Sequence, residues 1–140
     1  MKGIAVGLGL ASIGVMGCCL WMGTVQAAGQ DEAATPEFYT NKVQPILSAN
    51  CYRCHGGLNH RGGLNFQTRA GMMKGGHDGP VIVPGDPANS LLVRLIRHEG
   101  PANDPKPMPP KLPKISDEDI AVVERWVKAG AIMPEDTPQP

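Results

Sequence analysis

The pattern Cys-x-x-Cys-His, at Cys51, Cys54 and His55, constrains this chain more narrowly than any other feature of its sequence. Two thiols at this spacing can each add to a vinyl group of a haem, and the imidazole of the next residue can bind the haem iron. The pattern therefore predicts one covalently bound haem c, attached through Cys51 and Cys54, with His55 as an axial ligand of the iron.

Two other kinds of site also contain a Cys-x-x-Cys pair: a structural zinc site and a redox-active dithiol. A zinc site needs two further ligands, and the sequence has no second Cys-x-x-Cys pair to supply them, only His60, His77 and His98. A thioredoxin-like dithiol lies beside a βαβ pattern, whereas a helical pattern precedes Cys51 and glycines follow it. Both alternatives are weaker than the haem interpretation.

The N-terminus predicts export, in agreement with the haem interpretation, because haem c is attached outside the cytoplasm. Residues 1–27 are predicted to be a signal peptide, with a positive charge at Lys2, an apolar stretch over 3–23 and a small-residue cleavage box at 25–27. We expect the mature protein in the periplasm or on the outer face of the cytoplasmic membrane. The alternative is an uncleaved anchor or lipidation at Cys18, and either would attach the protein to a membrane.

Cleavage after Ala27 would leave a small chain without spare cysteines. The remaining 113 residues suffice for one small domain, and of the four cysteines only Cys51 and Cys54 would remain. No disulfide could then join distant segments, so the haem would tie the chain together. The mature part has 12 basic and 13 acidic residues, which gives no electrostatic case for nucleic-acid binding.

Hydrophobic periodicity and capping residues predict an all-α fold, mainly helical with long loops rich in glycine and proline, around one covalent haem. The first helix should begin with Pro36 after the N-cap Thr35. Pro45 lacks an N–H donor and should kink or divide this helix. Its buried face is predicted to consist of Tyr39, Val43, Ile46 and Leu47.

Three further helices are expected, over 68–73, 90–97 and 116–130. Glycines at 75–76 should end the first of them and Gly100 the second. The third begins with a serine and three carboxylates, a favourable start for a helix. Its predicted buried stripe is Ile120, Val123, Trp126 and Val127.

The remaining segments complete the predicted domain organisation. Residues 64–66 and 81–83 are short apolar runs that would pair as one tiny β-ribbon. Residues 28–35 are expected to form a flexible lead-in, residues 36–134 the monohaem domain and residues 135–140 a disordered tail.

A segment with six prolines in thirteen residues, 101–113, precedes the last helix. Prolines reduce the freedom of the unfolded chain, so this loop is stiff enough to hold a weak thioether ligand, and Met108 at its middle is the predicted second axial ligand. The alternatives are ligation by His77 or His98, or an open sixth position. Met72–Met73 are expected to be core or surface residues. A polyproline recognition motif is another explanation of the prolines.

Several short segments together carry a family resemblance. They are Phe38–Tyr39, Val43–Leu47, Cys51–His55, Gly62–Leu64, Val83–Pro87, Ser90–Leu92, Met108–Pro110 and Trp126–Ala131. These segments resemble class I c-type cytochromes and, more narrowly, the planctomycete-type cytochrome c domain, over about Phe38 to Pro134. The resemblance implies a helical fold with its first and last helices crossing, His55 and Met108 as axial ligands, and one-electron transfer.

The sequence therefore predicts an exported monohaem c-type cytochrome that carries single electrons between redox partner proteins, and not a stand-alone enzyme. Two alternatives remain open. The first is a haem-bearing relay subunit of a larger exported redox complex. The second is a protein whose open sixth position binds ligands or reacts with peroxide.

Overall fold

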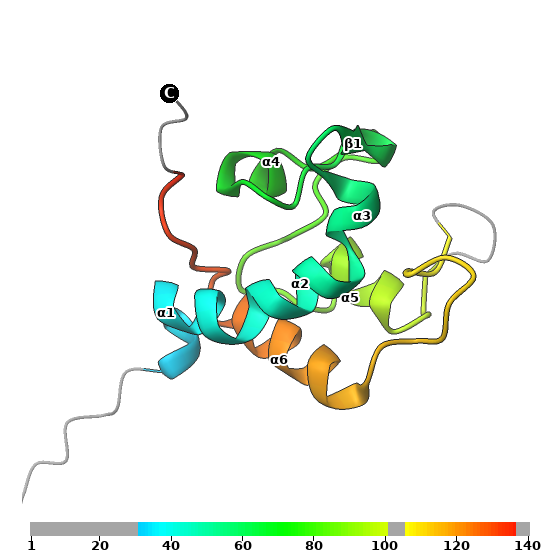
Figure 1. The fold of residues 1–140 in the computed structure, drawn as a ribbon. Coiled ribbons are helices and arrows are strands. Elements are labelled where there is room, and N and C mark those ends of the chain that lie inside the picture. Colours follow the sequence, from blue (N-terminus) through cyan, green and yellow to red (C-terminus); the bar gives the residue numbers. More distant parts are fainter. Residues whose placement is uncertain (1–30, 101–105, 137–140) are drawn as a thin grey trace, which may run out of the picture.

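A computed structural model of the chain describes residues 31–100 and 106–136. These residues form a mainly helical fold with no sheet, as the sequence predicts (Figure 1). The predicted signal peptide at 1–27, part of the proline-rich segment and the last four residues lie outside the described residues.

The N-terminal helix runs from Pro36 to Asn50 in three consecutive segments. These are α1 (Pro36–Phe38), the π-helical segment η2 (Tyr39–Val43) and α2 (Gln44–Asn50). The Thr35 hydroxyl accepts a hydrogen bond from the Phe38 N–H at 3.2 Å, which confirms the predicted N-cap.

Pro45 disturbs this helix without breaking it. In η2 the Gln44 N–H donates to the Tyr39 carbonyl, five residues back instead of four. A proline ring crowds the carbonyl four residues before it, so a wider turn at this point accommodates Pro45 and lets the helix continue to Asn50.

Three later helices are α4 (Arg69–Lys74), α5 (Leu91–Ile96) and α6 (Asp117–Lys128). The Thr68 and Ser116 hydroxyls cap α4 and α6, each accepting a backbone N–H at 3.0 Å, as predicted. The helix α5 ends before Gly100, which is not its stop. Instead His98 takes the left-handed conformation, with φ 60°.

The predicted β-ribbon is wrong, because residues 64–66 and 81–83 form no strand. The backbone of the second run is bonded to α5 and its cap. The Val81 carbonyl accepts the Leu92 N–H at 2.9 Å, and the Val83 N–H donates to the Ser90 hydroxyl at 2.9 Å. A short bridge instead joins β1 (Asn59–His60) to His55 and Gly56.

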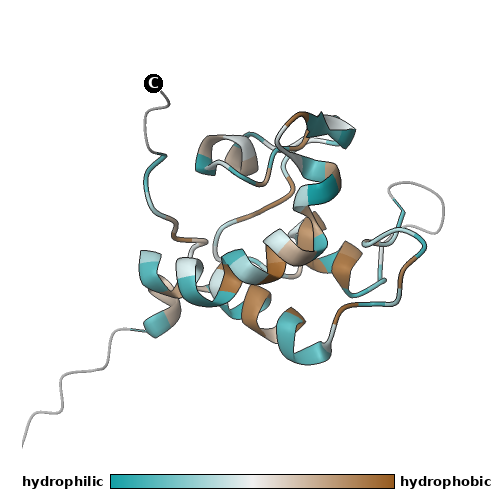
Figure 2. Cartoon of the chain, viewed as in Figure 1, coloured by the Kyte–Doolittle hydropathy of each residue, from teal (hydrophilic) through white to brown (hydrophobic). Residues whose placement is uncertain are grey.

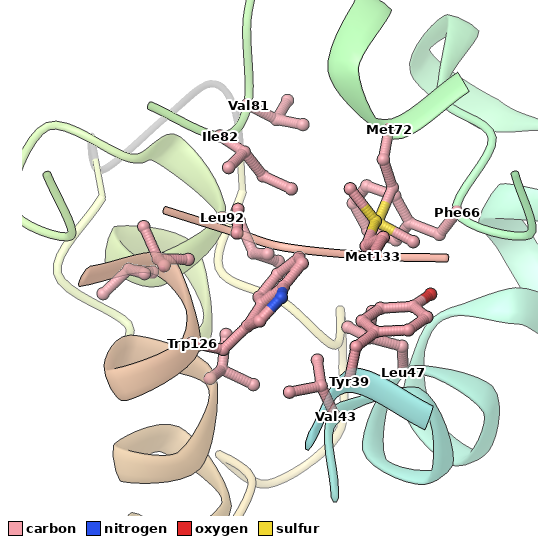
Figure 3. Packing of buried hydrophobic residues seen from close by; sticks show 14 of the residues in the cluster. Tyr39, Val43, Leu47, Phe66, Met72, Val81, Ile82, Leu92, Trp126 and Met133 are labelled. Atoms are coloured by element: carbon pink, nitrogen blue, oxygen red, sulfur yellow. The ribbon is translucent and has the colours of Figure 1, made fainter. Parts of the chain in front are cut away.

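The core lies between the N-terminal helix and α6, which cross and contact one another (Figure 1). The Tyr39 and Trp126 rings lie 5.5 Å apart between their centroids, and the fully buried Trp126 donates its indole N–H to the Ile132 carbonyl at 2.8 Å. Met72 and Met133 come together above Tyr39 (Figure 3). The apolar faces of α2, α5 and α6 point into this core (Figure 2).

Both ends of the described chain are bound to helices. Residues of the expected flexible lead-in form a 3-10 helix, η1 (Glu32–Ala34), in which Ala33 is fully buried, and Asp31 pairs with Arg125 of α6 at 2.9 Å. At the other end, the Asp136 carboxylate accepts the first two N–H groups of α4 at 2.6 and 2.9 Å. The described contacts of the fold therefore include residues outside 36–134 at both ends.

Ser90 is a fully buried polar residue at the start of α5. Its hydroxyl donates to the Asp86 carbonyl at 2.8 Å and accepts the Val83 N–H at 2.9 Å. These two bonds tie the turn at 83–86 to the helix.

We expect Ser90→Ala to destabilise the protein by about 1–3 kcal/mol, because the partly buried Val83 N–H loses the fully buried hydroxyl to which it donates. The free energy of unfolding in urea measures this loss. Ser48→Ala, at an exposed position of α2, is the control and should change the free energy by less than about 0.5 kcal/mol. Equal unfolding midpoints for the two variants would contradict the assignment.

Candidate haem site

The Cys-x-x-Cys-His motif occupies the end of α2 and the short helix α3 (Tyr52–His55). The Cys51 N–H donates to the Leu47 carbonyl at 2.8 Å, and the Cys51 carbonyl accepts the His55 N–H at 2.9 Å. Residues three and four positions apart lie on one face of a helix, so the turn presents Cys51, Cys54 and His55 together. All three are partly exposed, and both cysteines are free thiols.

The His55 ring is held by a backbone carbonyl. Its Nδ1 lies 2.8 Å from the Arg61 carbonyl oxygen. Because a carbonyl can only accept, Nδ1 must carry the proton, and the lone pair is left on Nε2, the atom that an axial ligand presents to iron. The Phe66 ring lies against the imidazole, with 5.6 Å between centroids. The ring is therefore prepared for a metal in the tautomer that haem ligation requires.

A glycine turn, η3 (Arg61–Gly63), places the Arg61 carbonyl. Gly62 and Gly63 both have positive φ, at 68° and 74°, where other residues are strained. The Gly62 carbonyl accepts the His77 N–H at 2.7 Å, which fixes the turn from its far side. Sequence reasoning missed Arg61 because its carbonyl, and not its side chain, is the functional group. The following glycine pair was the available signal.

The two thiols differ in their surroundings. Burial, and secondarily the neighbouring Cys54, raises the pKa of the Cys51 thiol to about 12. The group is therefore protonated at neutral pH in the chain without haem. Two thiols three positions apart and next to a prepared imidazole fit the donor set of covalent haem attachment.

Tyr52, between the two cysteines, has a buried hydroxyl with no hydrogen-bond partner among the described residues. Buried polar groups nearly always have a partner, so this hydroxyl marks a place where the site accommodates another group. Burial raises the pKa of the Tyr39 phenol far above its ordinary value, and the neighbouring Tyr52 phenol adds to the shift. The Tyr39 phenol is therefore neutral at physiological pH.

Met108 lies in the loop that follows residue 105, and it is half-buried. Its N–H donates to the Leu95 carbonyl of α5 at 3.0 Å, so the described contacts attach the loop to α5. None of the hydrogen bonds found among the described residues joins Met108 to the motif. Its ligation of iron is therefore taken up as a proposal below.

Residues 51–111 match the family model described as Planctomycete cytochrome C. This match confirms the resemblance predicted from the sequence. The matched segment begins at the first cysteine of the motif and includes Met108. No curated protein and no solved structure matches the chain significantly. A cytochrome c domain fits a haem c protein and an electron carrier.

The other sulfur and imidazole groups of the described residues lie elsewhere. Met72 and Met133 are buried in the core, where they serve as packing residues. His60 belongs to β1 on the motif's own side, while His77 and His98 are exposed. These positions leave Met108 as the methionine outside the core on a loop following α5.

No group of three or more His, Cys, Asp or Glu side chains in 31–100 and 106–136 is arranged to hold a metal ion. Over the same residues, no helix combines the length and apolar character needed to cross a membrane. Two surface hollows, of about 310 and 480 Å³, are lined mainly by α5, α6 and the turn at 85–88, and neither touches the motif.

We expect Gly76→Ala to loosen the His55 ring. A Cβ at Gly76 would meet the Gly62 carbonyl oxygen, so the glycine turn must shift and carry the Arg61 carbonyl away from Nδ1. The exchange rate of the His55 Nδ1–H in the reduced protein, followed by NMR, should rise. Gly79→Ala is the control, since a Cβ there has open space and introduces only local strain at φ 92°. An unchanged rate in Gly76→Ala would show that the turn does not hold the ring.

Proposed function

We propose that this chain is an exported monohaem c-type cytochrome that carries single electrons between redox proteins. The observation that carries the proposal is the imidazole of His55, fixed by the Arg61 carbonyl in one tautomer beside two free thiols on the same helical turn. The family match over residues 51–111 supports a haem c protein.

A bound haem c supplies one iron that alternates between Fe(II) and Fe(III). The chain's own residues hold and tune it. Cys51 and Cys54 would attach it covalently, and His55 would bind the iron through Nε2. The hydrogen bond from Nδ1 to the Arg61 carbonyl orients the ring and increases its basicity, which stabilises the oxidised iron.

Met108 is the proposed second axial ligand. A thioether is a weak ligand that favours the reduced iron and raises the reduction potential, whereas a second imidazole would lower it. Two features support Met108: it lies near the middle of the proline-rich segment, and its backbone is bonded to the Leu95 carbonyl of α5. With both axial positions filled, the iron has no open site for substrate, so the protein acts as a carrier.

Export is part of the proposal and rests on residues 1–27. A positive start, an apolar stretch and a small-residue box are the features of a secretory signal. Attachment of haem to the thiols requires this route, because the assembly takes place outside the cytoplasm. We therefore assign the mature protein to the periplasm or the outer face of the membrane.

The purified protein is expected to keep its haem after denaturation, because two thioether bonds hold it. Haem staining of a denaturing gel, together with ferric and ferrous absorption spectra, measures this. The variant with Cys51→Ser and Cys54→Ser should lose all covalent haem. Cys18→Ser with Cys19→Ser is the matched control and should keep it, since both residues lie in the predicted signal peptide. Release of haem from the denatured wild type would overturn the proposal.

Met108→Ala should abolish the far-red sulfur-to-iron absorption band of the ferric protein and lower the reduction potential. The reduced variant should bind carbon monoxide, while the wild type should bind it poorly. Met73→Ala, at a partly exposed methionine of α4, is the control and should change neither the band nor carbon monoxide binding. Survival of the band in Met108→Ala would move the axial ligand to another residue.

A further inference from the structure

Charge is distributed unevenly along this neutral chain. No acidic residue lies between Glu37 and Asp78, or between Asp104 and Asp117. These two intervals contain eight of the thirteen basic residues and none of the thirteen acidic ones. The first interval contains the haem-attachment motif and the second contains Met108. Positive charge is therefore concentrated on the segments that carry the proposed haem ligands.

Most of these cations remain free, in contrast to cations elsewhere in the fold. Arg97 pairs with Glu124 of α6, and Arg125 pairs with Asp31 at 2.9 Å. Within the two intervals, six exposed cations form no ion pair among the described residues: Lys42, Arg53, Arg61, Lys74, Lys106 and Lys111. Their charge is directed to solvent and is available to a binding partner.

Exposed leucines accompany these free cations on both segments. Leu58 is fully exposed, at 104%, in the turn between α3 and β1, and Leu112 is 62% exposed in the loop after Met108. Hydrogen bonds hold this turn in a defined conformation. The Asn59 side chain donates to the Arg53 carbonyl at 3.2 Å, and an antiparallel β-bridge joins His55 to His60. A folded turn therefore holds an apolar side chain in water between Arg53 and Arg61.

We propose that Arg53, Leu58 and Arg61, together with Lys111 and Leu112, form a docking surface for the acidic face of a partner protein. The proposal rests on the function proposed above. If His55 and Met108 bind the same iron, the turn and the loop lie on opposite sides of one haem. A partner docked across both would approach the haem between them.

The chemistry of the surface fits a brief encounter. Charge complementarity raises association rates about 10- to 10³-fold and falls steeply with ionic strength. Redox encounters bury little area, under about 1,200 Å², so a few apolar contacts inside a polar rim suffice. Leu58 and Leu112 supply those contacts, and Arg53, Arg61 and Lys111 supply the polar rim.

The same features argue for a protein rather than an anionic membrane as the partner. Membrane-surface binding uses an amphipathic helix with a continuous apolar face. Here α3 has four residues, and the part of the chain that contains α3 and β1 is mostly hydrophilic (Figure 2). Single leucines on two separate segments match a small protein contact instead.

Oxidation of the reduced protein by small inorganic complexes tests the surface. The mature chain has 12 basic and 13 acidic residues, so evenly spread charge would repel ferricyanide, and its rate would rise with salt. A basic surface at the haem predicts the opposite salt dependence. As the salt concentration rises, the rate of oxidation by ferricyanide should fall and the rate of oxidation by a cationic cobalt complex should rise. Whether the reduced protein is oxidised at all, fast or slowly, tests the proposed function. The sign of the salt dependence of the oxidation rate tests only the docking surface.

Charge-reversal variants locate the effect. Arg53→Glu with Arg61→Glu should lower the ferricyanide rate at low salt by about tenfold or more and reverse its salt dependence. Arg94→Glu with Lys128→Glu makes the same change in net charge at exposed positions of α5 and α6, and it should preserve the sign. Equal effects of the two pairs would overturn the proposal, because net charge alone would then explain them.

A binding experiment tests the surface directly. A deca-glutamate peptide serves as the acidic probe, and NMR of the labelled, haem-loaded protein shows which residues it contacts. Amide shifts should concentrate at 53–61 and 106–112 and disappear at high salt. Vesicles of phosphatidylglycerol in phosphatidylcholine are the competing probe. Binding to the vesicles without binding to the peptide, or peptide shifts spread over α5 and α6, would refute a protein-docking surface here.

Discussion

Packing of the N-terminal helix against α6 fixes the position of the haem-attachment motif. Tyr39 meets Trp126 at 5.5 Å between ring centroids, and Val43 beside them is fully buried. Because α2 ends directly at Cys51, whose N–H donates to the Leu47 carbonyl, the first cysteine is a fixed extension of this helix. The position of the three motif side chains that are proposed to bind haem follows from the contact between two helices that are distant in sequence.

Beyond Cys51, hydrogen bonds within residues 55–67 hold the segment around the His55 imidazole in place. The Phe66 N–H donates to the His55 carbonyl at 2.6 Å, and the Gln67 side chain accepts the Gly57 N–H at 2.5 Å. Together with the Arg61 carbonyl on Nδ1, these bonds make a compact loop around the imidazole without a sheet.

The methionine side of the site is built differently. Its described anchor is one backbone bond, from Met108 to Leu95. The imidazole side is the more strongly constrained, and a thioether is the weaker ligand. If His55 and Met108 bind the iron as proposed, exchange of a ligand should therefore begin at Met108.

Capping and helix periodicity were predictable because their signals are local. Thr35, Thr68 and Ser116 each accept an N–H three residues ahead, so the sequence contains both partners of the bond within one turn. The buried stripe of α6 followed from 3.6-residue spacing in the same way. The Cys-x-x-Cys-His motif was equally predictable from the sequence, since its chemistry depends on three side chains within five residues.

The errors share a different cause, which is dependence on distant or backbone partners. The run at 81–83 is apolar and buried, as a strand would be, but its backbone groups bond to Leu92 and Ser90. Asp31 looked like part of a flexible lead-in, yet its partner Arg125 lies 94 positions away. Neither partner can be chosen from a sequence pattern, because many residues of the right type compete for the role.

The acidic residues and the basic residues have different structural roles in this fold. Asp31, Glu124 and Asp136 bind cations or helix N–H groups that secure chain ends and helices. Exposed pairs of this kind contribute little each and weaken in salt. Among residues 31–100 and 106–136, the side chains of Arg53 and Arg61 make no such bonds, so the described fold does not depend on them. A chain with no net charge can in this way keep its stabilising ion pairs apart from a basic surface, and that surface can change without loss of the fold.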